Sequence, residues 1–182
     1  MQQLKLPASS PKISAKSNMD TAYLLLGSNM GDRLANINNA IHKIQTICGD
    51  VIQLSAVYET APWGYTEQDS FLNQVVVLDS NMHPTQLMLH LLEIEKVIGR
   101  VRDIKYGPRL IDIDILLFDD EIINNSILTL PHPELQNRKF TLLPLVEVAN
   151  ELIHPVIKQT IAELLLNCTD TCHVQKFSEP SK

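Results

Sequence analysis

GPRLIDIDILLF, residues 107–118, places two aspartates one residue apart inside an otherwise apolar run. Side chains alternate between the two faces of a strand, so Asp112 and Asp114 are expected on the same face. The opposite face would then carry Ile111, Ile113, Ile115 and Leu117. Two neighbouring carboxylates that lose hydration need a compensating cation, a shifted pKa or contact with solvent. The spacing alone therefore leaves two interpretations open, a divalent-metal site and a strand face that is simply wet.

The residues that lead into this strand are basic, although the chain as a whole has a formal net charge of −6. Arg100, Arg102, Lys105 and Arg109 lie within ten residues of one another. Guanidinium groups bind phosphate oxygens through paired hydrogen bonds, and cations beside a metal site suggest a polyphosphate ligand. The basic loop therefore favours a functional site over a solvated charged loop.

Strand and helix signals alternate along the rest of the chain. Short apolar runs closed by turn residues predict strands at 22–26, 51–58 and 71–78, and a pairing partner for the aspartate strand at 121–123. Apolar residues at helical spacing predict helices at 32–47, 84–98, 142–149 and 160–167. The order β-α-β-β-α-β predicts an α+β fold, a ferredoxin-like βαββαβ sandwich with extra C-terminal strands and helices.

The length and the composition fit one domain, because 182 residues with 45% hydrophobic content suit a single core. We expect a disordered lead-in at 1–20, a single domain at 21–171 and a solvated tail at 172–182. No apolar run has the length of a signal peptide or a membrane span, so the protein is expected to be soluble and cytoplasmic. The acidic balance argues against nucleic acid and anionic membranes as partners.

The three cysteines, Cys48, Cys168 and Cys172, are odd in number and do not have the spacing of a disulfide framework. This pattern agrees with a reducing compartment. Cys168, Cys172 and His173 lack a second ligand pair, so ordinary thiols are favoured over a zinc site.

Three other features are weak signals when each is taken alone. The turn GSNMG at 27–31 lacks the Lys-Ser/Thr ending of a Walker A sequence, so we interpret it mainly as structural turn chemistry. His132, between two prolines, is more often a loop or packing residue, and Arg138 is more often surface charge. Their neighbours along the chain must decide whether they act in a site.

Seven short motifs occur in order along the chain. They are GSN at 27–29, ETAP at 59–62, FLN at 71–73, GRVR at 99–102, GPRLIDID at 107–114, LPHP at 130–133 and NRKF at 137–140. Together they resemble the 6-hydroxymethyl-7,8-dihydropterin pyrophosphokinases of folate biosynthesis, over a match that runs from about Ala22 to Leu166. The resemblance implies transfer of pyrophosphate from ATP, as co-substrate, to the hydroxymethyl group of the dihydropterin, giving the pterin diphosphate and AMP.

The same resemblance implies roles for individual residues. Asp112 and Asp114 would hold two Mg²⁺ ions, and Arg100 and Arg109 would join them as catalytic residues that neutralise charge in the transition state. The ATP site would consist of Gln74, Glu95, Arg100, Arg102, Arg109, His132 and Arg138. The pterin site would consist of Thr60, Pro62, Trp63, Phe71, Asn73 and Phe140.

Three departures from the usual family pattern concern the loops and the pterin site. The first pterin-facing aromatic residue is often tyrosine and is Phe71 here; Tyr106 replaces a common tryptophan, and Ala61 a frequent proline. Trp63 is expected either to line the pterin pocket or to pack its loop. The two long loops at 58–70 and 100–110 are expected to close over the bound substrates.

Two other functions remain as alternatives. A noncatalytic ferredoxin-like module that binds a small ligand would explain the fold but not the aspartate pair beside clustered arginines. A kinase that transfers the γ-phosphate would have similar metal and arginine groups, and would release ADP rather than AMP. The sequence is also compatible with association between this chain and neighbouring folate-pathway enzymes that are separate proteins.

Overall fold

The computed structural model describes residues 19–61, 69–100 and 108–179. Nearly all of the predicted lead-in lies outside the described residues. So do Pro62, Trp63, Arg102 and Tyr106, and with them most of the two loops that were expected to close over the substrates.

Most of the described strands form one antiparallel sheet. They are β1 (Asp20–Ser28), β2 (Asp50–Leu54), β3 (Tyr58–Thr60), β4 (Phe71–Ser80), β5 (Asp112–Phe118) and β8 (Val174–Lys176). Their order is β5-β1-β4-β3-β8, and β2 pairs with the remaining length of β4. The path β5-β1-β4-β2 has the antiparallel order of a ferredoxin-like sheet, which confirms the predicted α+β class. A separate hairpin consists of β6 (Ile123–Asn124) and β7 (Thr129–Leu130).

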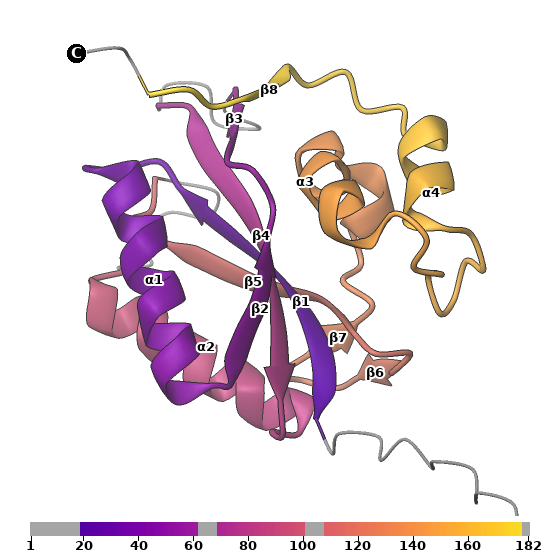
Figure 1. Ribbon diagram of the computed structural model, residues 1–182, viewed down its shortest axis with the longest axis horizontal. Coiled ribbons are helices and arrows are strands. Elements are labelled where there is room, and N and C mark those ends of the chain that lie inside the picture. Colours follow the sequence, from indigo (N-terminus) through magenta and orange to yellow (C-terminus); the bar gives the residue numbers. More distant parts are fainter. Residues whose placement is uncertain (1–18, 62–68, 101–107, 180–182) are drawn as a thin grey trace, which may run out of the picture.

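Helices cover both faces of the sheet (Figure 1). One face carries α1 (Arg33–Ile47) and α2 (Pro84–Ile98); the other carries α3 (Lys139–Ala149) and α4 (Ile161–Asn167), with the short 3₁₀ helix η1 (Leu135–Asn137) before them. Asp32 caps α1 by accepting the Ala35 N–H at 3.0 Å. Gly99 ends α2 with φ of +107°, a conformation that favours glycine. Among the described helices, none is long and apolar enough to cross a membrane.

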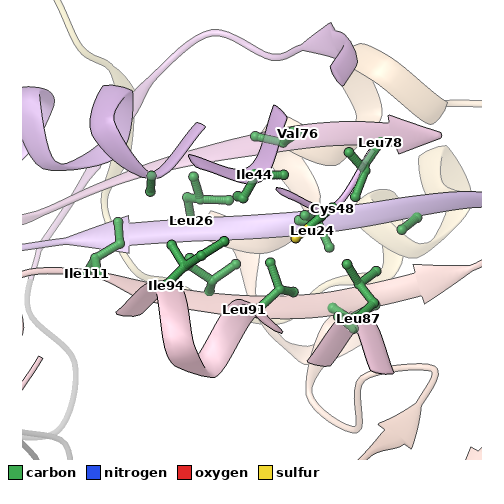
Figure 2. Packing of buried hydrophobic residues seen from close by; sticks show 14 of the residues in the cluster. Leu24, Leu26, Ile44, Cys48, Val76, Leu78, Leu87, Leu91, Ile94 and Ile111 are labelled. Carbon is green, nitrogen blue, oxygen red and sulfur yellow. The ribbon is translucent and has the colours of Figure 1, made fainter. Parts of the chain in front are cut away.

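Two hydrophobic cores lie on the two faces of this sheet. Figure 2 shows the first, where Leu24 and Leu26 of β1 meet Ile44 of α1 and Leu91 of α2. The second lies beneath α3 and α4 and includes Leu25, Val75, Leu142, Leu145 and Leu164. Because both faces are covered, the central strands are apolar on both sides, and a polar side chain in them requires a specific partner.

A register shift in β5 changes one sequence expectation. The pairing of β1 with β5 is irregular between Tyr23 and Leu24, where an extra residue of β5, Leu116, is accommodated. Ile111, Ile113 and Ile115 lie in the first core, as predicted. Leu117 lies in the second core with Leu116, so the expectation that it shares their face was wrong.

Three further boundaries differ from the predictions. The single strand expected at 51–58 is two strands, β2 and β3, which pair with different parts of β4. The segment 121–123 does not pair with β5; Ile123 belongs to β6 and pairs with β7. The solvated tail expected from 172 was also wrong, because Val174–Lys176 forms β8 on the edge of β3 and Phe177 packs against the first core.

Candidate active site

One cavity of about 310 Å³ lies at the C-terminal end of β1, beside the first residues of β4 and β5. The register explains its composition, because Gly27 of β1 is paired with Asn73 of β4 on one side and with Asp112 of β5 on the other. Adjacent strands lie less than about 5 Å apart, so these two side chains flank the same point of the backbone. Eleven of the predicted site residues line the cavity: Thr60, Phe71, Asn73, Glu95, Arg100, Arg109, Asp112, Asp114, His132, Arg138 and Phe140.

The acidic and basic groups form a network at one end of the cavity. Arg100, just beyond α2, is paired with both Glu95 and Asp112, and Arg109 is also paired with Asp112. Burial works against the charge of Arg100, but Asp112 and Glu95 outweigh it and raise the pKa of the guanidinium group. Asp112 is therefore paired with two guanidinium groups.

Glu95 is 2% exposed and lies four residues after Leu91, within the buried face of α2 and not on its solvated outer face. Its carboxylate accepts the N–H of Ile113, between the two aspartates, at 2.7 Å and is paired with Arg100. Burial, which the attraction of Arg100 opposes, raises its pKa. Glu95 thus joins α2 to β5 and orients Arg100 toward the cavity.

Asp114 is the carboxylate whose ionisation is most strongly disfavoured. Burial, together with the negative charges of Asp112 and Glu95, raises its pKa to about 7, against the opposing effect of Arg100 and Arg109. Asp112 and Asp114 both face the cavity, and neither lies on an open strand face. Asp112 and Asp114 offer adjacent oxygen ligands, and the nearby arginines do not fully compensate the negative charge of Asp114. Such a pair fits Mg²⁺, which binds one or two carboxylates together with substrate phosphates and water.

His132 and Arg138 come from the segment that leads from β7 into α3. The Glu134 N–H donates to His132 Nδ1 at 3.2 Å, which assigns the proton of the neutral ring to Nε2. Burial lowers the pKa of His132, and the nearby Arg138 lowers it further. The imidazole is therefore a neutral hydrogen-bond donor, and the Arg138 guanidinium lies 5.7 Å from the centre of the Phe140 ring.

The cavity lining also includes aromatic rings and uncharged polar groups. Phe71 and Phe140 contribute the rings, and the Asn73 side-chain amide donates to Thr60 Oγ1 at 2.9 Å. Asn73 and Thr60 are both almost fully buried. A Cβ at Gly27 would lie 3.2 Å from Asn73 Oδ1, so a larger residue there would require the Asn73 side chain to shift by a few tenths of an ångström. Two aromatic rings and two buried polar side chains therefore border the same cavity.

The structure does not bring every predicted residue to the cavity. Gln74 points to the opposite face of β4 from Asn73, and its amide donates to the Ser55 carbonyl at 2.8 Å. It does not line the cavity, whereas Pro62, Trp63 and Arg102 lie outside the described residues.

Apolar residues complete the cavity wall and were not predicted as site residues. They are Leu25, Met88, Leu92, Ile113 and Leu116, together with the methyl-bearing Ala61 and Thr141. Their sequence signal was that of ordinary core residues at helix or strand spacing, which does not reveal that one edge of the side chain borders a cavity.

An α+β domain that gathers three carboxylates and three arginines around one cavity suits an enzyme that transfers phosphate groups. Residues 23–150 match the family model of 7,8-dihydro-6-hydroxymethylpterin-pyrophosphokinase (HPPK). The chain belongs to this family.

Relatives of known name agree with this assignment. The 2-amino-4-hydroxy-6-hydroxymethyldihydropteridine pyrophosphokinase of Aquifex aeolicus is 42% identical over 145 residues, which is 80% of this chain and 90% of the relative. The folic acid synthesis protein fol1 of Pneumocystis carinii is 38% identical over 160 residues, 87% of this chain but 22% of the relative. The predicted family and enzyme class, a dihydropterin pyrophosphokinase of folate biosynthesis, are therefore confirmed.

Solved structures support the fold. An HPPK-DHPS enzyme in complex with substrates has a TM-score of 0.67 at 17% identity and covers 82% of this chain. Plasmodium falciparum HPPK-DHPS A437G has a TM-score of 0.68 at 18% identity and covers 85%. This chain spans less than half of either structure, 43% and 46%. At these identities the likeness establishes the α+β fold.

Proposed function

We propose that the chain transfers pyrophosphate from ATP to the hydroxymethyl group of 6-hydroxymethyl-7,8-dihydropterin, through the cavity described above. One observation carries the proposal: a carboxylate and arginine network and two phenyl rings line one cavity of about 310 Å³. Such a cavity accepts a polyphosphate at one end and a flat heterocycle at the other. The hydroxyl oxygen of the pterin attacks the β-phosphorus and its proton is released to solvent, while the bond from that phosphorus to the α-bridging oxygen breaks and AMP leaves.

The arginines supply fixed positive charge to this step. Arg100 and Arg109 are paired with Asp112, where they neutralise the negative charge that is redistributed as the pyrophosphoryl group moves. His132 Nε2–H and the Arg138 guanidinium donate to oxygens of the triphosphate. Glu95 contributes to ATP binding through the position of Arg100 rather than as a separate hydrogen-bond partner.

Asp112 and Asp114 are proposed as the ligands of two Mg²⁺ ions. When bound, the metal neutralises phosphate charge and polarises the reacting oxygens. The carboxylates hold this positive charge at the boundary between the two halves of the cavity, since Asp112 is the cross-strand neighbour of Gly27 and Gly27 is that of Asn73. The site therefore concentrates positive charge beside the end of the pterin that carries the hydroxymethyl group.

The two phenyl rings are proposed to bind the pterin. Phe71 and Phe140 stack on the two faces of the ring system, and Asn73 and Thr60 hydrogen-bond to its edge. Arg138 lies against the Phe140 ring and close to His132, so it connects the stacked ring with the triphosphate groups. Pro62, Trp63 and Arg102 remain proposals from the sequence resemblance.

The test is the identity of the nucleotide product. The chain is incubated with ATP, Mg²⁺ and the hydroxymethyl dihydropterin, and the nucleotides are separated by chromatography. We expect AMP and the pterin diphosphate in equal amounts. ADP would instead identify a kinase that transfers the γ-phosphate, and no nucleotide turnover would support the noncatalytic binding module. Asp112→Ala serves as the control, because it removes the proposed metal ligand.

We also propose that the chain works in the cytoplasm beside enzymes of the same pathway. Relatives named folic acid synthesis protein fol1, and solved structures named HPPK-DHPS, are longer than this chain and contain a region similar to it. A separate protein that takes the pterin diphosphate as its substrate is the corresponding partner. Size-exclusion chromatography of the chain mixed with such an enzyme would reveal a stable complex by co-elution, and separate elution would exclude one.

A further inference from the structure

Asn29 lies in the turn between β1 and α1 and is bonded to two segments that are far from it in the sequence. It is 2% exposed. Its backbone N–H donates to the Arg109 carbonyl at 3.2 Å, and its side-chain Oδ1 accepts the Arg109 N–H at 2.8 Å. On the other side, its Nδ2 donates to the Asp69 carbonyl at 3.3 Å. One side chain therefore joins the ends of the two long loops.

The two partners lead to opposite halves of the cavity. Asp69 is two residues before Phe71, whose ring lines the proposed pterin site, and the intervening Ser70 carbonyl accepts from Arg33 at 2.7 Å. Arg109 is three residues before Asp112 and is paired with it through its side chain. A displacement of Asn29 would therefore be transmitted to both halves through short stretches of backbone.

These side-chain bonds are not required to form the local turn. Asp32 caps α1, and the Asn36 side-chain amide donates to the Met30 carbonyl at 2.9 Å and to Ser28 Oγ at 3.4 Å. The turn is thus secured by other groups, while the amide of Asn29 bonds outside it. An amide carries an acceptor and a donor in one plane, a combination that a carboxylate, a hydroxyl or an alkyl group does not offer with this reach.

We propose that Asn29 is a positioning residue that fixes the spacing between the pterin and the triphosphate of ATP. This inference rests on the proposed function. In-line attack requires the hydroxyl oxygen and the β-phosphorus to approach to about 3 to 3.5 Å, and a misplacement of about 1 Å costs about a hundredfold in rate. The amide of Asn29 holds the two loop ends at a fixed separation, so that each substrate is bound in register with the other.

Three variants separate this role from a role in the turn. Asn29→Ala removes both side-chain bonds, and kcat is expected to fall by about ten- to a hundredfold. Asn29→Asp keeps an acceptor for the Arg109 N–H but places a carboxylate against the Asp69 carbonyl, so the KM for the pterin is expected to rise more than the KM for ATP. Asn36→Ala weakens the same turn without touching either loop, and its kcat is expected to stay within about twofold of the original value.

Binding measurements provide a readout that does not require turnover. Calorimetry gives the pterin Kd with and without α,β-methylene-ATP, an analogue in which the bond to be broken is inert. If Asn29 couples the two halves, the factor by which the analogue changes pterin affinity is expected to shrink towards one in Asn29→Ala and to be preserved in Asn36→Ala. Should Asn29→Ala not fold, Asn29→Asp, which preserves the size of the side chain, carries the same test.

Two results would overturn the inference. The first is that both Asn29 variants have the same kcat and the same coupling factor as Asn36→Ala. The other is an equal effect of Asn29→Asp on the KM values of the two substrates. Failure of the proposed function has a different signature, because the unaltered chain would then form no AMP. Loss of AMP in the Asp112→Ala control alone, with unchanged Asn29 variants, would reject the positioning role and leave the activity in place.

Discussion

The charge of Asp114 is expected to serve binding and to lower the stability of the folded protein. Its pKa is raised to about 7 because burial, Asp112 and Glu95 all disfavour its charge. An asparagine side chain has the same shape and no charge, so Asp114→Asn is expected to lower turnover by at least about a hundredfold. In metal-free buffer at pH 8 the same variant is expected to have an equal or higher Tm, because a repulsive buried charge is gone. AMP assay and thermal denaturation measure the two effects.

Either of two results for Asp114→Asn would contradict this explanation of the role of Asp114. Retained turnover in Asp114→Asn would show that the carboxylate is not a ligand that the reaction needs. A clearly lower Tm would show that Asp114 is stabilised by contacts that the charge network does not explain. Asp120→Asn, a substitution of the same kind at an exposed turn just past the other end of β5, is the matched control.

Phe71 tests the pterin half of the cavity independently of the phosphate half. Stacking of a base on an aromatic side chain contributes about 1 to 3 kcal/mol, so Phe71→Ala is expected to raise the KM for the pterin by about tenfold or more. The KM for ATP should change little, because Phe71 contributes an aromatic ring to the cavity and no charged group that could bind phosphate. Steady-state kinetics with each substrate varied in turn gives both values. Equal changes in the two KM values would contradict the assignment of separate halves.

Among the elements, β8 pairs with β3, and one glutamate of α3 contacts both of these strands. Glu147 accepts from the Ala56 N–H at 2.7 Å and from the Tyr58 hydroxyl at 2.9 Å, and it is paired with Lys176 of β8. Burial raises its pKa, but the bonds from Lys176, Ala56 and Tyr58 outweigh this effect and lower it below the usual 4.5. These contacts connect α3 with β3, the strand that carries Thr60 to the cavity.

Glu147→Gln is therefore expected to lower stability near pH 7 by about 1 to 2 kcal/mol, or about 3 to 6 °C in Tm. A carboxylate whose folded-state pKa is lowered contributes stability above the unfolded-state pKa and loses it as the pH falls through the folded-state value. The difference in Tm between the two proteins should thus be largest at neutral pH and shrink below about pH 4. Glu151→Gln, at an exposed position just past the same helix, is the control. A difference in Tm that is independent of pH would contradict the ionic origin.

The sequence predicted elements well where one local signal dominated. Asp32 and Gly99 marked the start of α1 and the end of α2, because capping chemistry depends on adjacent residues. The face of Leu117 could not be predicted, since the irregularity in β5 is a property of its pairing with β1. β8 has three residues and no alternation of its own, and it forms only because the edge of β3 is available.

The site was predicted to a similar degree and for similar reasons. Asp112, Asp114 and the arginines were found because charges in or beside an apolar strand are unusual. The bond of Glu95 to Ile113 and the double bonding of Asn29 join residues that are far apart in the sequence, 18 positions in the first case and 40 and 80 in the second. Spacing along one segment carries no information about such contacts. Gln74 shows the converse error, since its neighbour Asn73 reaches the cavity and the alternation of the strand directs Gln74 away from it.

The whole molecule combines a net charge of −6 with a cavity that holds Arg100, Arg109 and Arg138. The overall charge repels ATP at long range, whereas the arginines attract it once it is within about one Debye length. Because Debye lengths are about 10 Å at 0.1 M salt, contacts inside the cavity should dominate affinity over the distant surface charges. The pterin carries no phosphate, so it provides an internal comparison within the same protein.

Raising the salt from about 0.05 M to about 0.5 M is therefore expected to increase the KM for ATP severalfold and to leave the KM for the pterin nearly unchanged. The measurement uses saturating Mg²⁺ throughout. It is made once with potassium chloride and once with potassium acetate, because an effect of screening is the same for both salts and an effect of specific anion binding is not. Arg138→Gln should weaken the salt dependence of the KM for ATP, because one of the screened contacts is absent. A KM for ATP that falls as salt is added would mean that repulsion by the acidic surface governs binding. Parallel changes in the KM values of both substrates would mean that salt acts on the fold and not on the phosphate contacts.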